Sequence, residues 1–205
     1  MKYIIGITGG SGSGKTTVSD AFRKKGIEVV DGDKVARLIM EPGQECLEET
    51  VLAFGNEILD EDGRLKRREL AKIVFSNSEK LETLNKITHK YITQYFLDRV
   101  KHSSSDIVGI DGAALFESGI DKLCDSLIGV VSDEEIRVER IMKRDGISER
   151  DARMRINSQK NNQFYIENCD FLVYNNNEEE KIPEMIEEVL GKLVSEKERK
   201  KRKHI

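Results

Sequence analysis

The sequence predicts an α/β fold in three layers, with a five-stranded parallel sheet between helices. Five short runs are apolar at consecutive positions, as expected of strands that are covered on both faces. Longer patterns with helical spacing alternate with these runs, which is typical of a parallel sheet. The expected strands are Tyr3–Ile7, Ile27–Val30, Ile107–Ile110, Leu127–Val131 and Phe171–Tyr174, and the helices between them are expected near residues 15–25, 133–144, 148–160 and 181–197.

One interval interrupts this alternation. Residues 33–102 carry no strong strand signal, and a turn is expected at the sequence DEDGR. We therefore expect a helical insert at 33–102 within one domain of 205 residues. Its helices are expected near residues 33–40, 44–54, 67–75 and 78–101. The other expected parts are a core of residues 1–32, 103–135 and 161–195, a helical lid at 136–160 and a basic tail at 196–205.

The lid and the tail carry local signals. Ser132 with Glu135, and Ser148 with Asp151, have the spacing of helix-capping pairs, and Gly146 separates the two expected helices. The tail sequence SEKERKKRKHI is expected to be a solvated helix end, with nucleic acid or an acidic surface as the alternative partner.

Composition narrows the class of protein. A hydrophobic content of 38% is enough for a core, and a formal net charge of -4 argues against bulk binding of nucleic acid. No apolar run approaches the ~20 residues that span a bilayer, and no signal peptide is expected. The three cysteines, Cys46, Cys124 and Cys169, are too widely spaced for a metal site and suit a reducing compartment. We expect a cytoplasmic protein with no membrane or nucleic-acid partner.

The stretch GITGGSGSGKTT, between the first strand and the first helix, predicts a phosphate-binding loop. It contains the pattern G-x-x-x-x-G-K-[ST] at Gly9, Gly14, Lys15 and Thr16. Glycines let successive backbone N–H groups surround an anion, and the following helix N-terminus adds partial positive charge. Lys15 would reach the β- and γ-phosphates, and the Thr16 hydroxyl would ligate magnesium. A merely glycine-rich turn is the alternative, which the flanking strand and helix disfavour.

The loop alone does not define a reaction, because kinases, GTPases and motors all use it. No guanine-reading Asn-Lys-x-Asp is present, and the chain is small for a motor. A small chain with a helical insert and a basic helical hairpin favours a small-molecule kinase. The insert would hold the acceptor, and the hairpin would close over ATP.

Carboxylates follow two of the expected strands. Asp31 and Asp33 lie at the carboxyl end of the second strand, where open α/β sheets bind ligands. Asp33 is interpreted as a base for a substrate hydroxyl that can also cap the next helix, and for Asp31 the two roles stay open. Arg37 lies one helical turn after Asp33, and its side chain is expected either to bind a substrate phosphate or to pair with Asp33. Asp111 ends the third strand, where it would hold magnesium through water. Glu117 follows on a loop, facing the site or starting a helix.

Several motifs follow one another in order along the chain. The opening IGITGGSGSGKTTVSDAFRKKGIEVVDGDKVAR has an Asp-x-Asp at Asp31 and Asp33 and an Ala-Arg at Ala36 and Arg37, and in this it resembles the start of the dephospho-CoA kinase family. Further matches are EPG, FGNEILDEDGRLKRRELAKIVFSN, LNKITHKYI, ALFES, RIMKRDGISERDARMRINSQ and CDFLVYNN. The resemblance implies a P-loop NTPase fold and ATP-dependent phosphorylation of the ribose 3′-hydroxyl of dephospho-CoA, with Mg²⁺ accompanying ATP.

The resemblance also implies residue roles. Asp33 would activate the acceptor hydroxyl, while Lys15 and Arg140 would stabilise charge on the transferred group. ATP binding is expected at Gly9, Gly10, Gly12, Ser13, Gly14, Lys15, Thr16, Thr17, Arg144 and Asn175. Asn176 matches the family beside Asn175, and Gln159 matches the end of the lid motif. Substrate binding is expected at Asp31, Arg37, His89, Glu117 and Arg155.

Three positions depart from the family pattern. Lys90 replaces a proline after His89, Ala113 stands where proline is common, and Tyr174 stands where aspartate is usual. These departures allow a shifted acceptor preference, so a kinase for a nucleoside or another coenzyme is the rival enzyme. A nucleotide-binding regulatory protein is the rival from another class. We expect only small-molecule substrates and a monomer or weak homo-oligomer.

Overall fold

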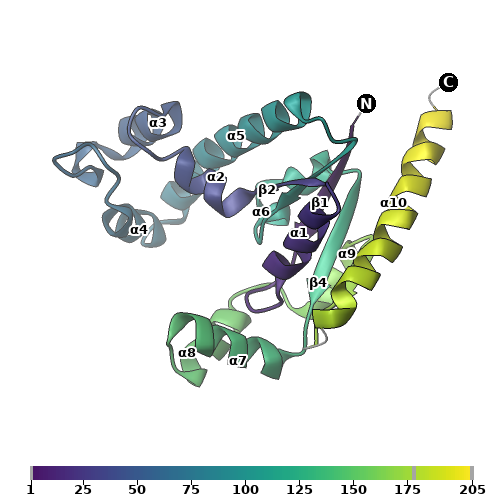
Figure 1. Cartoon of the computed structure of the whole chain (residues 1–205). Coiled ribbons are helices and arrows are strands. Elements are labelled where there is room, and N and C mark those ends of the chain that lie inside the picture. The colour runs from purple at the N-terminus through teal and green to yellow at the C-terminus, as the bar shows by residue number, and fades with distance from the viewer. Residues whose placement is uncertain (1, 177–178, 204–205) are drawn as a thin grey trace. The chain divides into compact units, whose positions relative to one another are not determined.

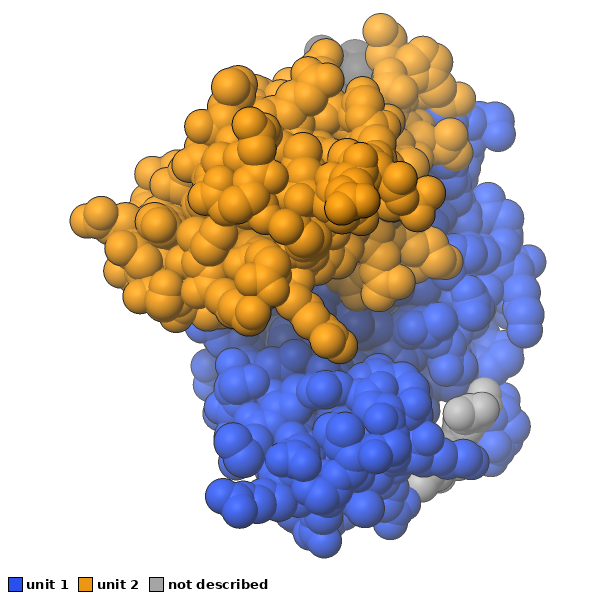
Figure 2. Space-filling model, turned by 90° about the vertical axis from the view of Figure 1, so that its left-hand side faces the viewer, with its two compact units in different colours: residues 1–30, 103–205 blue, residues 31–102 orange. Residues whose placement is uncertain are grey.

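The computed structural model describes residues 2–176 and 179–203. The chain divides into two compact units, which Figure 2 colours separately. Unit 1 comprises residues 1–30 and 103–205, and unit 2 comprises residues 31–102. Each unit is described by itself.

A single sheet organises unit 1, and it confirms the predicted α/β fold with five parallel strands (Figure 1). The strand order is β2-β3-β1-β4-β5, and parallel pairing joins β1 to β3, β1 to β4 and β4 to β5. Because β1 is central, the loop that follows it lies at the middle of the carboxyl edge, where such sheets bind ligands. The strands are β1 Tyr3–Thr8, β2 Glu28–Asp31, β3 Ile107–Asp111, β4 Ser126–Val131 and β5 Phe171–Tyr174.

Helices cover both faces of the sheet. On one face, α1 (Lys15–Lys24) and α10 (Ile182–Lys203) pack against each other and against the buried side chains of β1. Figure 1 shows α10 running along the sheet. On the other face lie α6 (Leu115–Ser118), a 3₁₀ turn at Ile120–Leu123, and α9 (Asn162–Asn168), which packs on β4. A further 3₁₀ turn, Glu179–Lys181, precedes α10.

A helical hairpin follows β4, in the region predicted as the lid. It consists of α7 (Glu134–Asp145) and α8 (Glu149–Asn157), which lie side by side (Figure 1). Gly146 ends α7 in the left-handed conformation at φ 65°, and the Ser148 side chain accepts a hydrogen bond from the Asp151 amide, as predicted. The two helices share a small core of Val138, Ile141, Ala152 and Ile156.

Unit 2 is helical throughout, apart from its turns and short connections. Its longest helix, α5, packs against α2, α3 and α4. The predicted turn is present: one oxygen of the Asp60 carboxylate accepts hydrogen bonds from the amides of Asp62 and Arg64. No helix in the described ranges is both long and apolar enough to cross a membrane. The helices of unit 2 are α2 Gly32–Leu38, α3 Glu45–Phe54, α4 Arg67–Phe75 and α5 Ser78–His102, with a 3₁₀ turn at Asn56–Ile58.

Candidate active site

The loop between β1 and α1 presents backbone N–H groups. Val18 donates the first hydrogen bond of the helical ladder, to the carbonyl of Gly14 at 3.3 Å. The amides of residues 15–17 therefore precede the ladder, and none of the side chains that the structure describes caps this end of α1. Gly14 has φ 86°, which favours glycine, and a Cβ there would collide with the Asn175 amide. A helix start of this kind is a site for an anion such as phosphate.

The remaining predicted loop residues shape the approach to this helix start. Gly9, Gly10 and Gly12 lie in the loop, and the buried Ser13 donates its amide hydrogen to the Gly10 carbonyl at 3.1 Å. Lys15 is half-buried in the first turn of α1, and no hydrogen bond or ion pair is recorded for its ammonium within the described residues. The loop thus places one cation beside a row of amide donors.

A carboxylate and hydroxyls lie next to the first turn. One oxygen of Asp111, at the end of β3, accepts a hydrogen bond from the Ser19 hydroxyl at 2.7 Å. Ser19 is three residues beyond Thr16, so both hydroxyls project from the same face of α1. Asp111 is also the register partner of Ile7, the penultimate residue of β1. These are oxygen donors of the kind that magnesium prefers.

Two predicted residues, Asn175 and Arg140, are hydrogen-bonded to the loop and to each other. Asn175 is 1% exposed, and its Nδ2 donates to the Ser13 carbonyl at 3.1 Å. Arg140 donates through Nη1 to the Gly12 carbonyl at 3.2 Å and through Nη2 to the Asn175 Oδ1 at 3.1 Å. The side chains of Asn175 and Arg140 therefore hold the backbone of the phosphate loop directly.

The capping role predicted for Ser132 is wrong. The N-cap of α7 is Asp133, one residue later, and Ser132 is buried. Its hydroxyl donates to the Asn175 carbonyl at 2.8 Å, so it supports the residue after β5 instead. The amide of Asp133 donates to the Asn176 side chain at 2.9 Å.

Arg144 and Arg155, the other predicted lid arginines, both bond to Asp145. Arg144 donates two hydrogen bonds, at 2.8 and 2.9 Å, and Arg155 donates a third. Hydrogen bonding from Arg144, with a further contribution from Arg155, lowers the pKa of Asp145 to about 2. Both arginines are exposed on the hairpin, and neither forms a hydrogen bond with the loop within the described residues.

Sequence reasoning missed two residues of this region, Ser19 and Arg137. Ser19 bonds to Asp111, and Arg137 is 2% exposed and donates through Nε to the Ser11 carbonyl at 2.9 Å. One signal was available for Arg137. It precedes Ile141 by four residues, so it lies on the apolar face of its helix, where an unpaired arginine would be costly.

In unit 2, Asp31 and Asp33 have different surroundings. Asp31 is the N-cap of α2, accepting a hydrogen bond from the Lys34 amide at 3.0 Å, and it forms an ion pair with the Lys34 ammonium at 3.1 Å. Asp33 is exposed in the first turn, and its carboxylate has no recorded hydrogen bond or ion pair within the described chain. The alternative pairing of Arg37 with Asp33 is likewise not among the described ion pairs. The Asp33 carboxylate is thus accessible.

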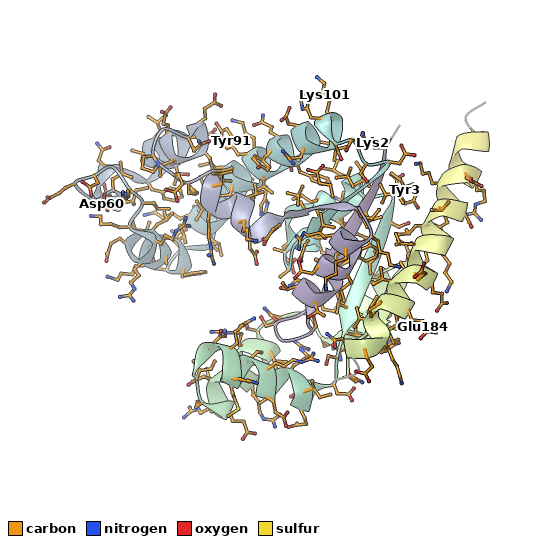
Figure 3. The ribbon with its side chains drawn as sticks, viewed as in Figure 1. Lys2, Tyr3, Asp60, Tyr91, Lys101 and Glu184 are labelled. Carbon is orange, nitrogen blue, oxygen red and sulfur yellow. The ribbon has the colours of Figure 1, made fainter. Side chains whose placement is uncertain are left out.

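His89 and its neighbour Lys90 lie within α5, which continues without a break to His102. Burial lowers the pKa of His89. Lys90, the departure from the family proline, pairs with Glu49 at 2.7 Å, and the Tyr91 hydroxyl donates to the same carboxylate at 2.8 Å (Figure 3 labels Tyr91). The added charge is therefore neutralised inside unit 2. This arrangement joins α5 to α3.

The same unit contains a cavity of about 350 Å³. Its walls come from the end of α2, the start of α3 and the middle of α5. The lining combines apolar, aromatic and amide side chains, including Ile39, Gln44, Cys46, Tyr91, Gln94 and Tyr95.

Three remaining predicted or divergent residues lie at the surface of unit 1. Glu117 is exposed on α6. Its charge adds to the effect of burial, which raises the pKa of Tyr165 to about 12. Ala113 is half-buried after β3, and Tyr174 is 50% exposed at the end of β5.

Comparison with known proteins identifies similar sequences along nearly the whole chain. The sequence model of one family, described as dephospho-CoA kinase, matches residues 3–181. A dephospho-CoA kinase from Fusobacterium nucleatum is 41% identical over 184 residues, which are 90% of this chain and 95% of that protein. One from Listeria monocytogenes is 38% identical over 200 residues, covering 96% of this chain and all of its own length (100%).

Solved structures agree with the sequence comparisons. The structure of TT1252 from Thermus thermophilus has a TM-score of 0.80 and 30% identity, and covers 94% of this chain and 98% of its own. A dephospho-CoA kinase from Campylobacter jejuni has a TM-score of 0.67 and 25% identity, with the same coverage, 94% and 98%. A shikimate kinase from Bacteroides thetaiotaomicron, at 12% identity and a TM-score of 0.55, shares the fold.

Proposed function

This chain belongs to the dephospho-CoA kinase family, and we propose that it phosphorylates the 3′-hydroxyl of dephospho-CoA with ATP on the loop after β1 and Asp33 as general base. The observation that carries the proposal is the set of amides at the start of α1, which have Lys15 beside them and are capped by no side chain of the described ranges. Such a set suits the phosphates of a nucleotide. The product is coenzyme A, so this is the last step of its biosynthesis.

ATP lies on the loop Gly9–Thr17, in which Gly12–Thr17 bind the phosphates, and Lys15 contacts the β- and γ-phosphates. Arg140 is assigned to neutralise charge that develops on the transferred group, and its hydrogen bond to the Gly12 carbonyl keeps the guanidinium at the loop. Arg144 adds to ATP binding from the hairpin at 136–160, which acts as a lid and excludes water. Asn175 contributes by holding the loop through Ser13.

Magnesium accompanies ATP in this proposal. The Thr16 hydroxyl would hold the ion, and Asp111 would hold it through water, because the Ser19 bond sets that carboxylate beside the α1 face that carries Thr16. When bound, the ion neutralises phosphate charge.

The acceptor binds the insert at 33–102. Asp33 accepts the proton of the 3′-hydroxyl as the oxygen attacks the γ-phosphorus, and ADP leaves with the bridging oxygen. The exposure of the Asp33 carboxylate supports this role. Contacts to the acceptor are assigned to Asp31, Arg37, His89, Glu117 and Arg155, and the cavity of about 350 Å³ in unit 2 offers room for part of it.

The decisive experiment is mass spectrometry of the product formed from ATP, Mg²⁺ and dephospho-CoA, with nucleosides as competing acceptors. Coenzyme A as the preferred product supports the proposal, and a preferred nucleoside would move the chain to another kinase activity. Nucleotide binding with no transfer to any acceptor would favour a regulatory protein.

Two substitutions test the residue roles. Asp33→Asn is expected to lower kcat roughly 10²–10⁴-fold while Mg·ATP still binds, whereas Asp62→Asn, at another exposed carboxylate of unit 2, leaves kcat unchanged. Lys15→Ala is expected to weaken both ATP binding and turnover. Unchanged turnover in Asp33→Asn would refute the base role. We also propose that the protein is cytoplasmic. We further propose that it is a monomer or weak homo-oligomer, and light scattering would measure this oligomeric state.

A further inference from the structure

Ser11, in the phosphate loop, is held by one side chain from α7 and one from the turn that follows α8. Its amide donates to Gln159 Oε1 at 2.8 Å, and Gln159 Nε2 donates back to the Ser11 hydroxyl at 3.0 Å. Its carbonyl accepts from Arg137 Nε at 2.9 Å. All three polar groups of Ser11 are therefore bonded to α7 or to the turn after α8.

The burial of Arg137 at this position is expected to lower the stability of the fold. It is 2% exposed, and burial lowers its pKa. Its Nη2 has no hydrogen-bond partner within the described residues, and a Cβ on Gly10 would collide with this atom. A buried, incompletely paired guanidinium destabilises a fold, so its presence calls for a role beyond stability.

Arg137 completes a row of bonds to consecutive carbonyls. Side-chain donors reach the carbonyls of Ser11, Gly12 and Ser13 from Arg137, Arg140 and Asn175 respectively. In a trans peptide the N–H group points away from the C=O group of the same unit. Carbonyls held by these side chains therefore fix the following N–H groups in the direction away from them. The Ser11 amide is already used by Gln159 and the Ser13 amide by the Gly10 carbonyl, so the amides left for phosphate are those of Gly12, Gly14 and the first turn of α1.

We propose that Arg137 and Gln159 are positioning residues that clamp Ser11 and so hold the phosphate-binding amides in place before the nucleotide arrives. Neither side chain needs to contact ATP. The clamp lowers the ordering cost of binding, because the loop does not have to become rigid on contact with phosphate. This inference rests on the proposed function only in taking the loop as the ATP site.

The two clamp residues lie at the wall of a cavity. Arg137 and Gln159 line a cavity of about 700 Å³ together with Lys160, Asn162 and Phe164. Water from this cavity can reach the polar groups of Ser11 when the Gln159 amide is removed, so Gln159→Leu is expected to loosen the loop without unfolding the protein.

The test compares Arg137→Met, Arg137→Gln and Gln159→Leu with Arg153→Met as a matched control. Arg153 lies on the same hairpin and pairs with glutamates, but in the described part of the chain it has no hydrogen bond to the loop. We expect Arg137→Met to weaken Mg·ADP binding, measured by calorimetry, and to raise KM for ATP, each by roughly 10- to 100-fold. For Gln159→Leu we expect both changes to be roughly tenfold. Arg153→Met should leave both quantities unchanged.

The conservative variant separates positioning from charge. Arg137→Gln keeps an N–H donor for the Ser11 carbonyl without a positive charge, so it should recover most of the loss if Arg137 positions the loop. The proposal is overturned if Arg137→Gln is as poor as Arg137→Met, or if Gln159→Leu binds Mg·ADP like the control. If Arg137→Met does not fold, Arg137→Gln and Gln159→Leu still decide. A wild-type protein that binds no Mg·ADP would refute the ATP site itself, which is a different outcome.

Discussion

Asn175→Asp replaces the amide nitrogen of the Asn175 side chain, which holds the phosphate loop, by an oxygen. The Nδ2 donor, 3.1 Å from the Ser13 carbonyl, becomes an oxygen, while the Oδ1 that accepts from Arg140 is retained. Asn175 is 1% exposed, so the carbonyl loses its donor and faces a second oxygen in a buried place. An unsatisfied buried group costs about 1–3 kcal/mol. For a chain of this length that corresponds to a fall in Tm of roughly 2–12 °C.

The matched control is Asn176→Asp. Its recorded hydrogen bond uses Oδ1, which accepts from the Asp133 amide and is kept in aspartate. We expect calorimetry to show a lower Tm in Asn175→Asp than in Asn176→Asp, and a steady-state assay to show a roughly tenfold higher KM for ATP, since the Ser13 carbonyl sets the direction of the next amide. Equal Tm and equal KM in the two variants would refute the reasoning that Asn175 holds the loop.

Three further predictions concern the hairpin, the insert and the thiols. Arg153→Met removes ion pairs at the surface of the hairpin, and such pairs contribute little to stability because water screens them. Tm should therefore fall by a few degrees at most, and a fall above ~10 °C would contradict this reasoning. Because burial lowers the pKa of His89, the unfolded state binds more protons below about pH 6.5. The free energy of unfolding should then decline as pH falls from 7 to 5, less steeply in His89→Gln, and parallel curves would exclude the effect. Burial raises the pKa of the Cys46 thiol to about 11 and those of the Cys124 and Cys169 thiols to about 12. Iodoacetamide should therefore alkylate them in the native protein at pH 8 roughly 10²–10³-fold more slowly than a free thiol, because the thiolate is the reactive form. Mass spectrometry of the alkylated peptides would measure the three rates.

Most of the fold could be predicted from the sequence because its signals are local. The five strands are short apolar runs that are buried from both sides, and the helices between them carry their own periodicity. The insert was recognisable by the absence of strand signals across residues 33–102. In each case the chain's own pattern determines the element, and tertiary contacts only shift its ends by a few residues.

The support of the loop could not be predicted, because it depends on contacts distant in sequence. Ser132 has the composition of an N-cap, yet its hydroxyl bonds to the Asn175 carbonyl, 43 residues away. Asn175 was expected to contact the nucleotide because it matches a nucleotide-binding position of the family that the sequence resembles, but its amide is buried against Ser13. Whether it also contacts ATP stays a prediction. The sequence pattern can show that a residue will form a hydrogen bond, but the tertiary packing determines which residue is its partner.

Gly10 offers a last test of how the loop and hairpin depend on each other. It occupies the first x of the G-x-x-x-x-G-K-[ST] pattern, where the pattern does not require glycine, and the nearest atoms to a Cβ placed there belong to the Arg137 guanidinium. Gly10→Ala should therefore displace that group and break its bond to the Ser11 carbonyl, with the same effect on KM for ATP as Arg137→Met. The double variant should be no worse than either single one, because both remove the same bond. Additive losses in the double-mutant cycle would mean that glycine is needed at position 10 for a reason other than Arg137.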